Sequence, residues 1–448
     1  MKKILLIGAG RSTSSLVQYL LFNAEKENWF LTIADQSKDL ASESADNHKN
    51  AKAIAFDVNN DEERERLIDE NDLIISMLPA HLHMSVANDC IKYKKHLATA
   101  SYVSEEMKAL DSEAKAAGIV MMNEIGVDPG IDHLSAMRVI DDIREKGGDL
   151  EVFETFTGGL VAPESDNNPW GYKFTWDPRN VVLAGQGTCK FIQNKRYKYI
   201  PYHKLFRRTE IIEIDGYGKF EGYANRDSLQ YREIYGLEDI PTMYRGTLRK
   251  PGFCKAWHYF VKMGVTDDTY VMEDSENMTN RQFINSFLPY NPHDSVELKF
   301  KHYFNIRQDD VEIFEKFVWL GIFDETKIGL KDATPAQILQ HILEQKWTLE
   351  DDDKDMILMW HRFRYKLNGE DKELHSSMVV KGDDQKYTAM AKTVGLPLAI
   401  SVKMILNGTI STPGVHVPIV KEIYNPILDE LENYGINFIE REVEPSFY

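Results

Sequence analysis

The first fourteen residues, MKKILLIGAGRSTS, constrain the fold more than any other segment of the chain. The apolar run from Ile4 to Ile7 stops at Gly8, which is typical of a short strand that is buried on both faces. A helical pattern from Ser12 to Leu20 follows directly. A strand, a glycine turn and a helix in this order predict the start of a βαβ unit, in which successive strands are parallel.

The same alternation continues through about residue 122. Further short apolar runs, separated by helix-like segments, lie at residues 30–34, 73–77, 96–100 and 118–122. We therefore predict an α/β protein in which residues 1–125 form a Rossmann-type, doubly wound parallel sheet.

The pattern changes beyond Gly126. Residues 150–156 and 209–214 alternate in polarity, and the first of these segments contains two phenylalanines, which favours antiparallel strands. Mostly helical patterns follow from about residue 265 to residue 360, and again from residue 388. The expected divisions are an α+β domain, a helical insertion within it and a C-terminal segment, at residues 126–265 with 361–387, at 266–360 and at 388–448, respectively.

The charge balance argues against nucleic acid and membrane surfaces as partners. The chain has 53 basic and 71 acidic side chains, and its formal net charge of -18 repels phosphate backbones and anionic lipids. Its three cysteines lie far apart without metal-ligand spacing, and no run of 18 apolar residues occurs. We expect a small-molecule substrate, no metal, no nucleic-acid or membrane partner, and a cytoplasmic location.

The segment Gly8-Ala9-Gly10 lies between the first predicted strand and the first predicted helix. A bare backbone at this place lets a pyrophosphate approach the unpaired amides of a helix N-terminus. Thr13 occupies the third position of the GxGxxG fingerprint, so the match is partial, and an ordinary strand-to-helix turn is the alternative. The residues that we expect in a dinucleotide site here are Gly8, Gly10, Arg11 and Ser12.

Asp35 ends the second apolar run, where an acidic side chain accepts hydrogen bonds from the ribose hydroxyls of a dinucleotide. A carboxylate there repels a 2′-phosphate, and the next residues, Gln36 and Ser37, are neutral. Arg11, in the glycine turn, is the residue that would favour NADP. We therefore expect NAD as the cofactor and keep NADP as the alternative; a solvated aspartate that opens a turn is the purely structural interpretation.

Several longer segments occur in a fixed order along the chain. They are the stretch from His96 that contains NEIGVDPGIDH, FTGGLVAPESDNNPWGYKFTW from Phe156, YANRDS from Tyr223, RGTLR from Arg245, and MAKTVGLPLA from Met390. Together they resemble the saccharopine dehydrogenase family, glutamate-forming type (saccharopine reductase), over essentially the whole chain.

The resemblance implies a Rossmann domain, a substrate domain that dimerises in related enzymes, and a C-terminal segment that returns to the first domain. It implies an NAD(P)-dependent oxidoreductase that acts on the CH-NH group of a secondary amine in lysine metabolism. The reaction interconverts saccharopine with glutamate and aminoadipate semialdehyde. By the same resemblance we expect a homodimer.

Site residues are carried over motif by motif. Those that resemble saccharopine contacts are Ser101, Tyr102, Arg226, Thr247, Leu248 and Arg249, and those that resemble a cofactor-proximal loop are Val127, Asp128 and Pro129. The resemblance gives Tyr102 and Asp128 catalytic roles beside the reacting amine, with Asp128 as the candidate for proton transfer. Tyr102 and Asp128 each follow an apolar run, so adjacent strand ends would bring them together.

Charge chemistry supports the arginines independently. Saccharopine has three carboxylates, and the planar fork of arginine suits bidentate carboxylate binding. Arg245, Thr247 and Arg249 would share one face of a strand at period two. Surface ion pairs are the alternative for the arginines, and a simple turn is the alternative for Asp128-Pro129-Gly130.

Other features leave alternatives open. Thr157 stands where close fungal-type relatives carry a cysteine, so no catalytic thiol is expected there. His81 and His83 could suggest a metal pair, but they lack further ligands in register, and we expect them to be solvated. The rival functions are a dehydrogenase of polyamine metabolism that acts on a carboxynorspermidine or homospermidine type of amine, and a noncatalytic dinucleotide-binding regulator.

Overall fold

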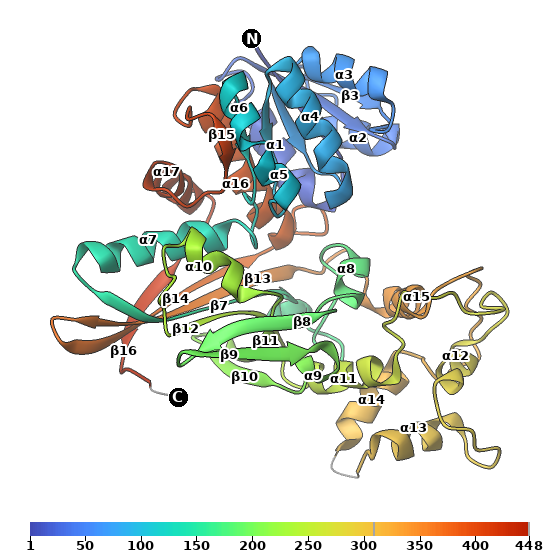
Figure 1. Ribbon diagram of the computed structural model, residues 1–448. Coiled ribbons are helices and arrows are strands. Elements are labelled where there is room, and N and C mark those ends of the chain that lie inside the picture. Colours follow the sequence, from blue (N-terminus) through green and yellow to red (C-terminus); the bar gives the residue numbers. More distant parts are fainter. Residues whose placement is uncertain (308–309, 447–448) are drawn as a thin grey trace. The chain divides into compact units, whose positions relative to one another are not determined.

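The computed structural model describes residues 1–307 and 310–446, which form two compact units (Figure 1). The first unit consists of Met1–Leu150, Tyr365–Lys372 and Met378–Pro445. The second consists of Glu151–Arg364 and Glu373–Ser377, together with Ser446.

The first unit contains a seven-stranded parallel sheet in the order β15-β6-β5-β4-β1-β2-β3. The strands are β1 (Lys2–Ile7), β2 (Trp29–Asp35), β3 (Ala51–Ala55), β4 (Leu73–Ser76), β5 (His96–Ala98), β6 (Val120–Met122) and β15 (Gly414–His416). The order reverses at β1, as in a doubly wound fold, and this confirms the predicted fold class. Strand β3 was not predicted, because this edge strand is short and half exposed.

The helices of the first unit alternate with its strands or follow them in the sequence. They are α1 (Ser14–Asn23), α2 (Lys38–Ala45), α3 (Asp61–Asp69), α4 (His83–Tyr93), α5 (Glu105–Ala109), α6 (Asp111–Ala117), α7 (Ile131–Glu145), α16 (Ala389–Leu406) and α17 (Lys421–Glu432), with short 3-10 turns at Arg11–Thr13 and Ala80–Leu82. Helix α7 lies in the first unit by its contacts, although the sequence pattern assigned residues from 126 onward to the second domain. Arg138 and Asp141 of α7 bond to Asn425 and Tyr424 of α17, which ties the two helices together.

Helix α16 packs closely on α1. A Cβ on Gly395 would lie 2.7 Å from the amide nitrogen of Leu16, so only glycine allows this approach. Among the described residues, α16 is the one helix long and apolar enough to span a membrane, and 78% of that stretch is buried inside the protein. A helix so covered by its own chain is accounted for as a core helix.

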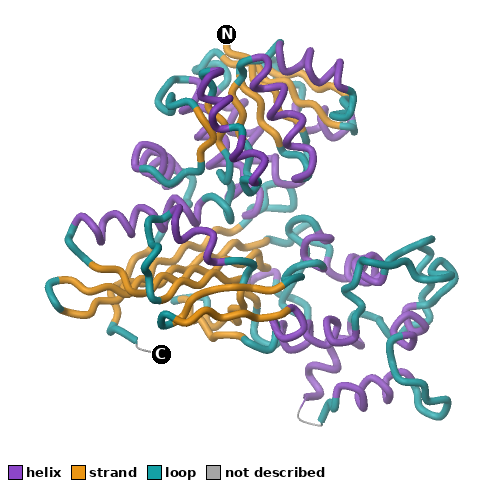
Figure 2. The backbone as a smooth tube through the Cα atoms, viewed as in Figure 1, coloured by secondary structure: helices purple, strands orange, loops and turns teal. Residues whose placement is uncertain are grey.

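Most residues of a second, mixed sheet belong to the second unit, and strands are drawn in orange in Figure 2. The strands of this sheet are β7 (Asp149–Val161), β8 (Thr188–Gln193), β9 (Arg196–Pro201), β10 (Thr209–Ile214), β11 (Gly218–Ala224), β12 (Thr242–Arg249), β13 (Asp355–Leu367), β14 (Glu370–Lys381) and β16 (Ile439–Val443). Strands β10, β11 and β12 pair antiparallel, but β7 and β12 pair in parallel. The expectation of antiparallel pairing was therefore wrong for the pair of β7 and β12, because alternating polarity identifies a half-buried strand but not the direction of its neighbour.

Helices of the second unit cluster around aromatic side chains. They are α8 (Pro178–Val182), α9 (Tyr202–Leu205), α10 (Tyr231–Ile234), α11 (Phe253–Met263), α12 (Asn280–Ser286), α13 (Val296–Phe304), α14 (Val311–Trp319) and α15 (Pro335–Trp347). Helix α15 begins at a capping box in which Thr334 and Gln337 bond reciprocally, with Pro335 in the first turn. Trp170 and Trp347 pack ring against ring in the core, with centroids 5.3 Å apart.

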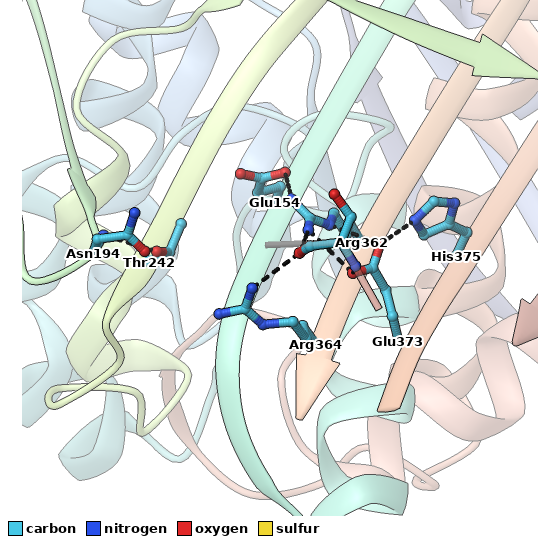
Figure 3. Close-up of polar contacts among 8 residues, drawn as sticks. Glu154, Asn194, Thr242, Arg362, Arg364, Glu373 and His375 are labelled. Carbon is cyan, nitrogen blue, oxygen red and sulfur yellow. Dashed lines mark hydrogen bonds and ion pairs between the residues drawn. The ribbon is translucent and has the colours of Figure 1, made fainter. Parts of the chain in front are cut away.

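A buried charge network lies on β7, β13 and β14 (Figure 3). Arg362 forms a two-pronged ion pair with Glu373, at 2.9 and 3.1 Å, and donates a further bond of 3.2 Å to Glu154. The main chain of Ser446 joins the network, since its carbonyl accepts bonds from Arg362 and Arg364 and its amide donates to Glu373. These bonds fix Ser446 to the second unit.

Candidate active site

The glycine turn after β1 has the backbone geometry that a close ligand approach requires. Gly8 has a φ of 99°, and a Cβ there would lie 2.7 Å from the carbonyl oxygen of Met77 at the end of β4. A Cβ on Gly10, in contrast, would meet no atom within 4 Å. Thr13 is buried, and its hydroxyl donates to the carbonyl of Gly10 at 2.7 Å. The third fingerprint position therefore tolerates threonine because the turn itself satisfies its hydroxyl.

A cavity of about 590 Å³ begins at this turn and runs along α1 and α2. Its lining includes Gly10 and Arg11 from the turn, together with His48 and Lys386. A ligand in this cavity would therefore contact the glycine turn on the side that faces α1 and α2.

Asp35 is fixed beside the turn at the end of β2. Its Oδ2 accepts the amide of Ala9 at 2.8 Å, and its Oδ1 accepts the amide of Ser37 at 2.8 Å. Each carboxylate oxygen offers more than one lone pair, so both oxygens can still accept ribose hydroxyls. Gln36 is exposed and brings no charge.

Tyr102 and Asp128 come together at the carboxyl edge of the sheet. Tyr102 follows β5, Asp128 follows β6, and the two strands pair in parallel. The Tyr102 hydroxyl donates to Asp128 Oδ1 at 3.2 Å, and both side chains are half-buried. The structure therefore brings Tyr102 and Asp128 together, as their positions after adjacent strands predicted. Their catalytic roles stay predictions.

Glu124, which was not among the predicted site residues, anchors the loop that carries Asp128. It is buried, its Oε1 accepts the amide of Val103 at 2.9 Å, and its Oε2 lies 2.7 Å from His133 Nε2 on α7. The carboxylate of Asp132 accepts the amide of Gly130 at 2.6 Å. The available signal was the pair of acidic residues on either side of Val127-Asp128-Pro129.

His83 is buried, so the expectation that it is solvated was wrong, whereas His81 is exposed. His83 is the first residue of α4 and lies between two serines. Its Nδ1 is 2.8 Å from Ser76 Oγ, and its Nε2 is 2.7 Å from Ser101 Oγ. A histidine bonded by two hydroxyls needs no solvent, and only the three-dimensional structure shows these partners.

The second unit holds the other group of predicted substrate contacts. Arg249 is buried, and its guanidinium carbon lies 5.0 Å from the ring centre of Tyr172 and 5.5 Å from that of Phe253. One guanidinium nitrogen donates to the carbonyl of Leu248, whose side chain is buried, and Nε bonds to no described residue. Arg249 is therefore a buried cation held by aromatic faces, without an acidic partner in the described residues.

Two threonines mark the middle of the second sheet. Thr247 on β12 lies opposite Thr157 on β7, and both are only partly buried between well-buried neighbours. Arg245 is buried, and its guanidinium carbon lies 4.3 Å from the ring centre of Tyr231. Arg226 has a φ of 48° and follows β11.

The structure thus groups the predicted residues within each unit: Ser101, Tyr102 and Asp128 in the first, Thr247, Leu248 and Arg249 in the second. Within residues 1–307 and 310–446, no three histidine, cysteine or acidic side chains lie close enough together to hold a metal ion.

Two family models match consecutive parts of the chain. The family model described as "Saccharopine dehydrogenase NADP binding domain" matches residues 4–122, and "Saccharopine dehydrogenase C-terminal domain" matches residues 126–436. The chain belongs to the saccharopine dehydrogenase family. Residues 4–122 are accordingly the nicotinamide dinucleotide-binding domain of that family.

Two proteins with the name saccharopine dehydrogenase match this chain along their whole length. The chain is 34% identical over 453 residues to "Saccharopine dehydrogenase [NADP(+), L-glutamate-forming]" of Schizosaccharomyces pombe, covering 99% of this chain and 100% of the relative. A solved structure of apo saccharopine dehydrogenase (L-Glu forming) from Saccharomyces cerevisiae is 32% identical, with a TM-score of 0.90 over 99% of this chain and 100% of that one. A homospermidine synthase from Legionella pneumophila shares the fold, at 10% identity and a TM-score of 0.57.

Proposed function

We propose that the protein is a saccharopine dehydrogenase of the glutamate-forming type, which interconverts saccharopine with glutamate and aminoadipate semialdehyde. The observation that carries the proposal is the full-length match to relatives with this name, combined with Tyr102 and Asp128 in hydrogen-bond contact at the dinucleotide edge of the sheet. The homospermidine synthase likeness, at 10% identity, supports only a common fold.

The cofactor supplies the redox chemistry, since the nicotinamide ring takes up or returns a hydride. The residues of the chain orient the secondary amine and move protons. Asp128 takes the proton that the amine loses, and Tyr102 holds the Asp128 carboxylate in position through its hydroxyl. With this proton and a hydride from the neighbouring carbon removed, the C–N bond becomes an imine. Water adds to the imine carbon, and the carbinolamine then breaks its C–N bond, which releases the aldehyde and, with a proton returned to nitrogen, glutamate.

Substrate carboxylates need cations, which a chain with a net charge of -18 must gather locally. Arg249 is such a cation, since aromatic faces surround it and no carboxylate of the described residues pairs with it. In the proposed reaction Arg249 and Arg226 bind carboxylates of saccharopine. An amine of polyamine metabolism, with fewer carboxylates, would use this site less well.

The preferred cofactor in our proposal is NAD, although the family model and the fungal relatives carry NADP in their names. The argument is local: a 2′-phosphate would meet the Asp35 carboxylate, which two amides hold in place, and Gln36 offers no charge to offset it. Arg11 is exposed on the glycine turn, and its positive charge would instead favour the 2′-phosphate of NADP.

One assay tests both parts of the proposal. Purified protein is mixed with saccharopine and either NAD or NADP, and reduced nicotinamide is followed by absorbance. We expect turnover with saccharopine, a much lower kcat/KM with carboxynorspermidine, and a higher kcat/KM with NAD than with NADP. The double variant Asp35→Ser with Gln36→Arg should reverse the cofactor preference. A wild-type enzyme that favours NADP contradicts the cofactor assignment, and one that leaves saccharopine unchanged contradicts the reaction.

A further inference from the structure

Three side chains from separate elements of the first unit form a hydrogen-bonded row. Ser76 ends β4 and is fully buried, His83 begins α4, and Ser101 follows β5. The oxygen-to-nitrogen distances are 2.8 Å from Ser76 to His83 Nδ1 and 2.7 Å from Ser101 to His83 Nε2. The row therefore leads from the buried sheet to Ser101, the half-buried serine that the family motif places against substrate.

The imidazole in this row is neutral near pH 7, because burial, helped by the nearby His81, lowers the pKa of His83 to about 4. A neutral imidazole has one N-H donor and one acceptor nitrogen. Only two arrangements are then open: His83 donates from Nε2 to Ser101, or it accepts the Ser101 proton at Nε2 and donates from Nδ1 to Ser76.

The proposed substrate selects between these arrangements. An ionised carboxylate only accepts hydrogen bonds, so Ser101 must keep its own proton free in order to bind one. Ser101 can do so when its oxygen accepts from His83 Nε2 and the Ser76 hydroxyl donates to Nδ1. The Ser101 amide also donates to Thr99 Oγ1 at 3.2 Å, which fixes the backbone that carries this hydroxyl.

We propose that His83 is a positioning residue, present as the Nε2-H tautomer, which aims the Ser101 hydroxyl proton at a carboxylate of the substrate. Donor direction then runs from Ser76 to His83, from His83 to Ser101, and from Ser101 to substrate. The inference rests on the proposed function, because it takes its direction from a carboxylate substrate.

The kinetic test compares His83→Leu, which removes both nitrogens, with His83→Gln, whose amide nitrogen can replace the Nε2 donor. His83→Leu should raise the KM for saccharopine about 3-fold to 10-fold, the loss expected for one oriented hydrogen bond. The KM for the dinucleotide should stay unchanged, and His83→Gln should stay within about 2-fold of wild type.

A double-mutant cycle separates positioning from a general structural role. In a Ser101→Ala background, His83→Leu should raise the saccharopine KM no further, because the hydroxyl that it orients is gone. Additive effects in this cycle, or an equal loss in folded His83→Gln and His83→Leu, would overturn the proposal. If His83→Leu does not fold, the same cycle is run with Ser76→Ala, which releases the other end of the imidazole.

The tautomer gives a readout without substrate. In 15N-1H correlation spectra, the His83 signals, assigned by their loss in His83→Gln, should show a protonated Nε2 and an unprotonated Nδ1. A protonated Nδ1 would contradict the proposed direction. If the wild-type protein does not turn over saccharopine, the proposed function is wrong. If the wild type is active but the effects of His83→Leu and Ser101→Ala are additive, only the positioning role of His83 is wrong.

Discussion

The Asp128 carboxylate accepts the Tyr102 hydroxyl on one oxygen. Before Asp128 in the chain, Glu124 accepts the amide of Val103 from the neighbouring loop, and after it Asp132 accepts the amide of Gly130. Glu124 and Asp132 thus hold the loop, whereas the Asp128 side chain faces Tyr102, which follows the neighbouring strand β5. This separation of tasks makes substitution of Asp128 informative, because the loop keeps its own anchors.

Replacing Asp128 with Asn should cut turnover by about 10² to 10⁴, the usual range for loss of a general acid or base. The amide keeps an acceptor for Tyr102 but cannot take up the amine proton. Steady-state kinetics at saturating dinucleotide and saccharopine, repeated across pH, should show one limb of the profile removed. Near-normal turnover with an unchanged profile in a folded variant would contradict the role.

Arg249→Ala should weaken saccharopine use by about 10-fold to 150-fold in kcat/KM, since a hydrogen bond to a charged group contributes about 1.5 to 3 kcal/mol. Arg226→Ala should act in the same direction. Arg196→Ala, on the exposed part of β9, is the matched control and should change nothing. Dinucleotide binding, measured by calorimetry, should be unaffected in all three, and unchanged substrate kinetics in both site variants would rule out carboxylate binding.

The sequence predicted some of these residues and missed others for a physical reason. Tyr102 and Asp128 follow apolar runs, so the rule for parallel sheets brought them to one edge. The bonds of His83 to Ser76 and Ser101, and of Glu124 to His133, depend on how α4 and α7 rotate above the sheet. No local pattern encodes that rotation, so a buried histidine was taken for a solvated one.

At the scale of elements, strands β7, β13 and β14 share the charge network around Arg362 (Figure 3). Arg362, Glu154 and Glu373 are at most 8% exposed. Charges buried this deeply are tolerated only as a set, since removal of one partner leaves the others unpaired.

Arg362→Met should therefore lower the free energy of unfolding by about 3 to 5 kcal/mol, the usual loss when one member of a buried ion pair is removed. Arg196→Met, at an exposed position, should change it by less than about 0.5 kcal/mol. Denaturant unfolding followed by tryptophan fluorescence measures both. Equal stability of Arg362→Met and wild type would show that the network is not stabilising.

Strand β10 adds a pH-dependent term to the stability. Burial, with the neighbouring Glu154, raises the pKa of Glu210 from 4.5 to about 7. The folded state thus binds the proton more tightly than the unfolded state, and this group lowers stability as pH rises from about 4.5 through 7. Glu210→Gln removes the effect, so its advantage over wild type in denaturant unfolding should be larger at pH 8 than at pH 5. Parallel pH profiles would refute the assignment.

Elements were predicted well where pattern and environment agree. The short apolar runs of the first unit became central parallel strands, whereas β3 escaped notice because its edge position leaves it half exposed. The parallel pairing of β7 with β12 joins strands more than 80 residues apart. Such pairing depends on the packing of the whole unit and leaves no mark on either strand.

For the whole molecule we propose a homodimer, as the family resemblance implies. Tyr197, Tyr199 and Ile211 on the edge strands β9 and β10 are more than half exposed, and large apolar side chains of this kind favour burial in an interface. Light scattering coupled to gel filtration should give twice the chain mass of 51.7 kDa. A variant with Tyr199→Lys and Ile211→Lys should elute as a monomer, and a wild-type mass of one chain would contradict the proposal.

The pairing of β15 with β6 determines when the first sheet can be completed during synthesis of the chain on the ribosome. Strand β6 leaves the ribosome about 290 residues before β15, which at 5 to 20 residues per second is a delay of roughly 15 to 60 s. During that interval the edge of β6 has no strand to pair with, and the second unit is synthesised in the meantime. Completion of the dinucleotide-binding sheet therefore has to wait until the second unit has been synthesised.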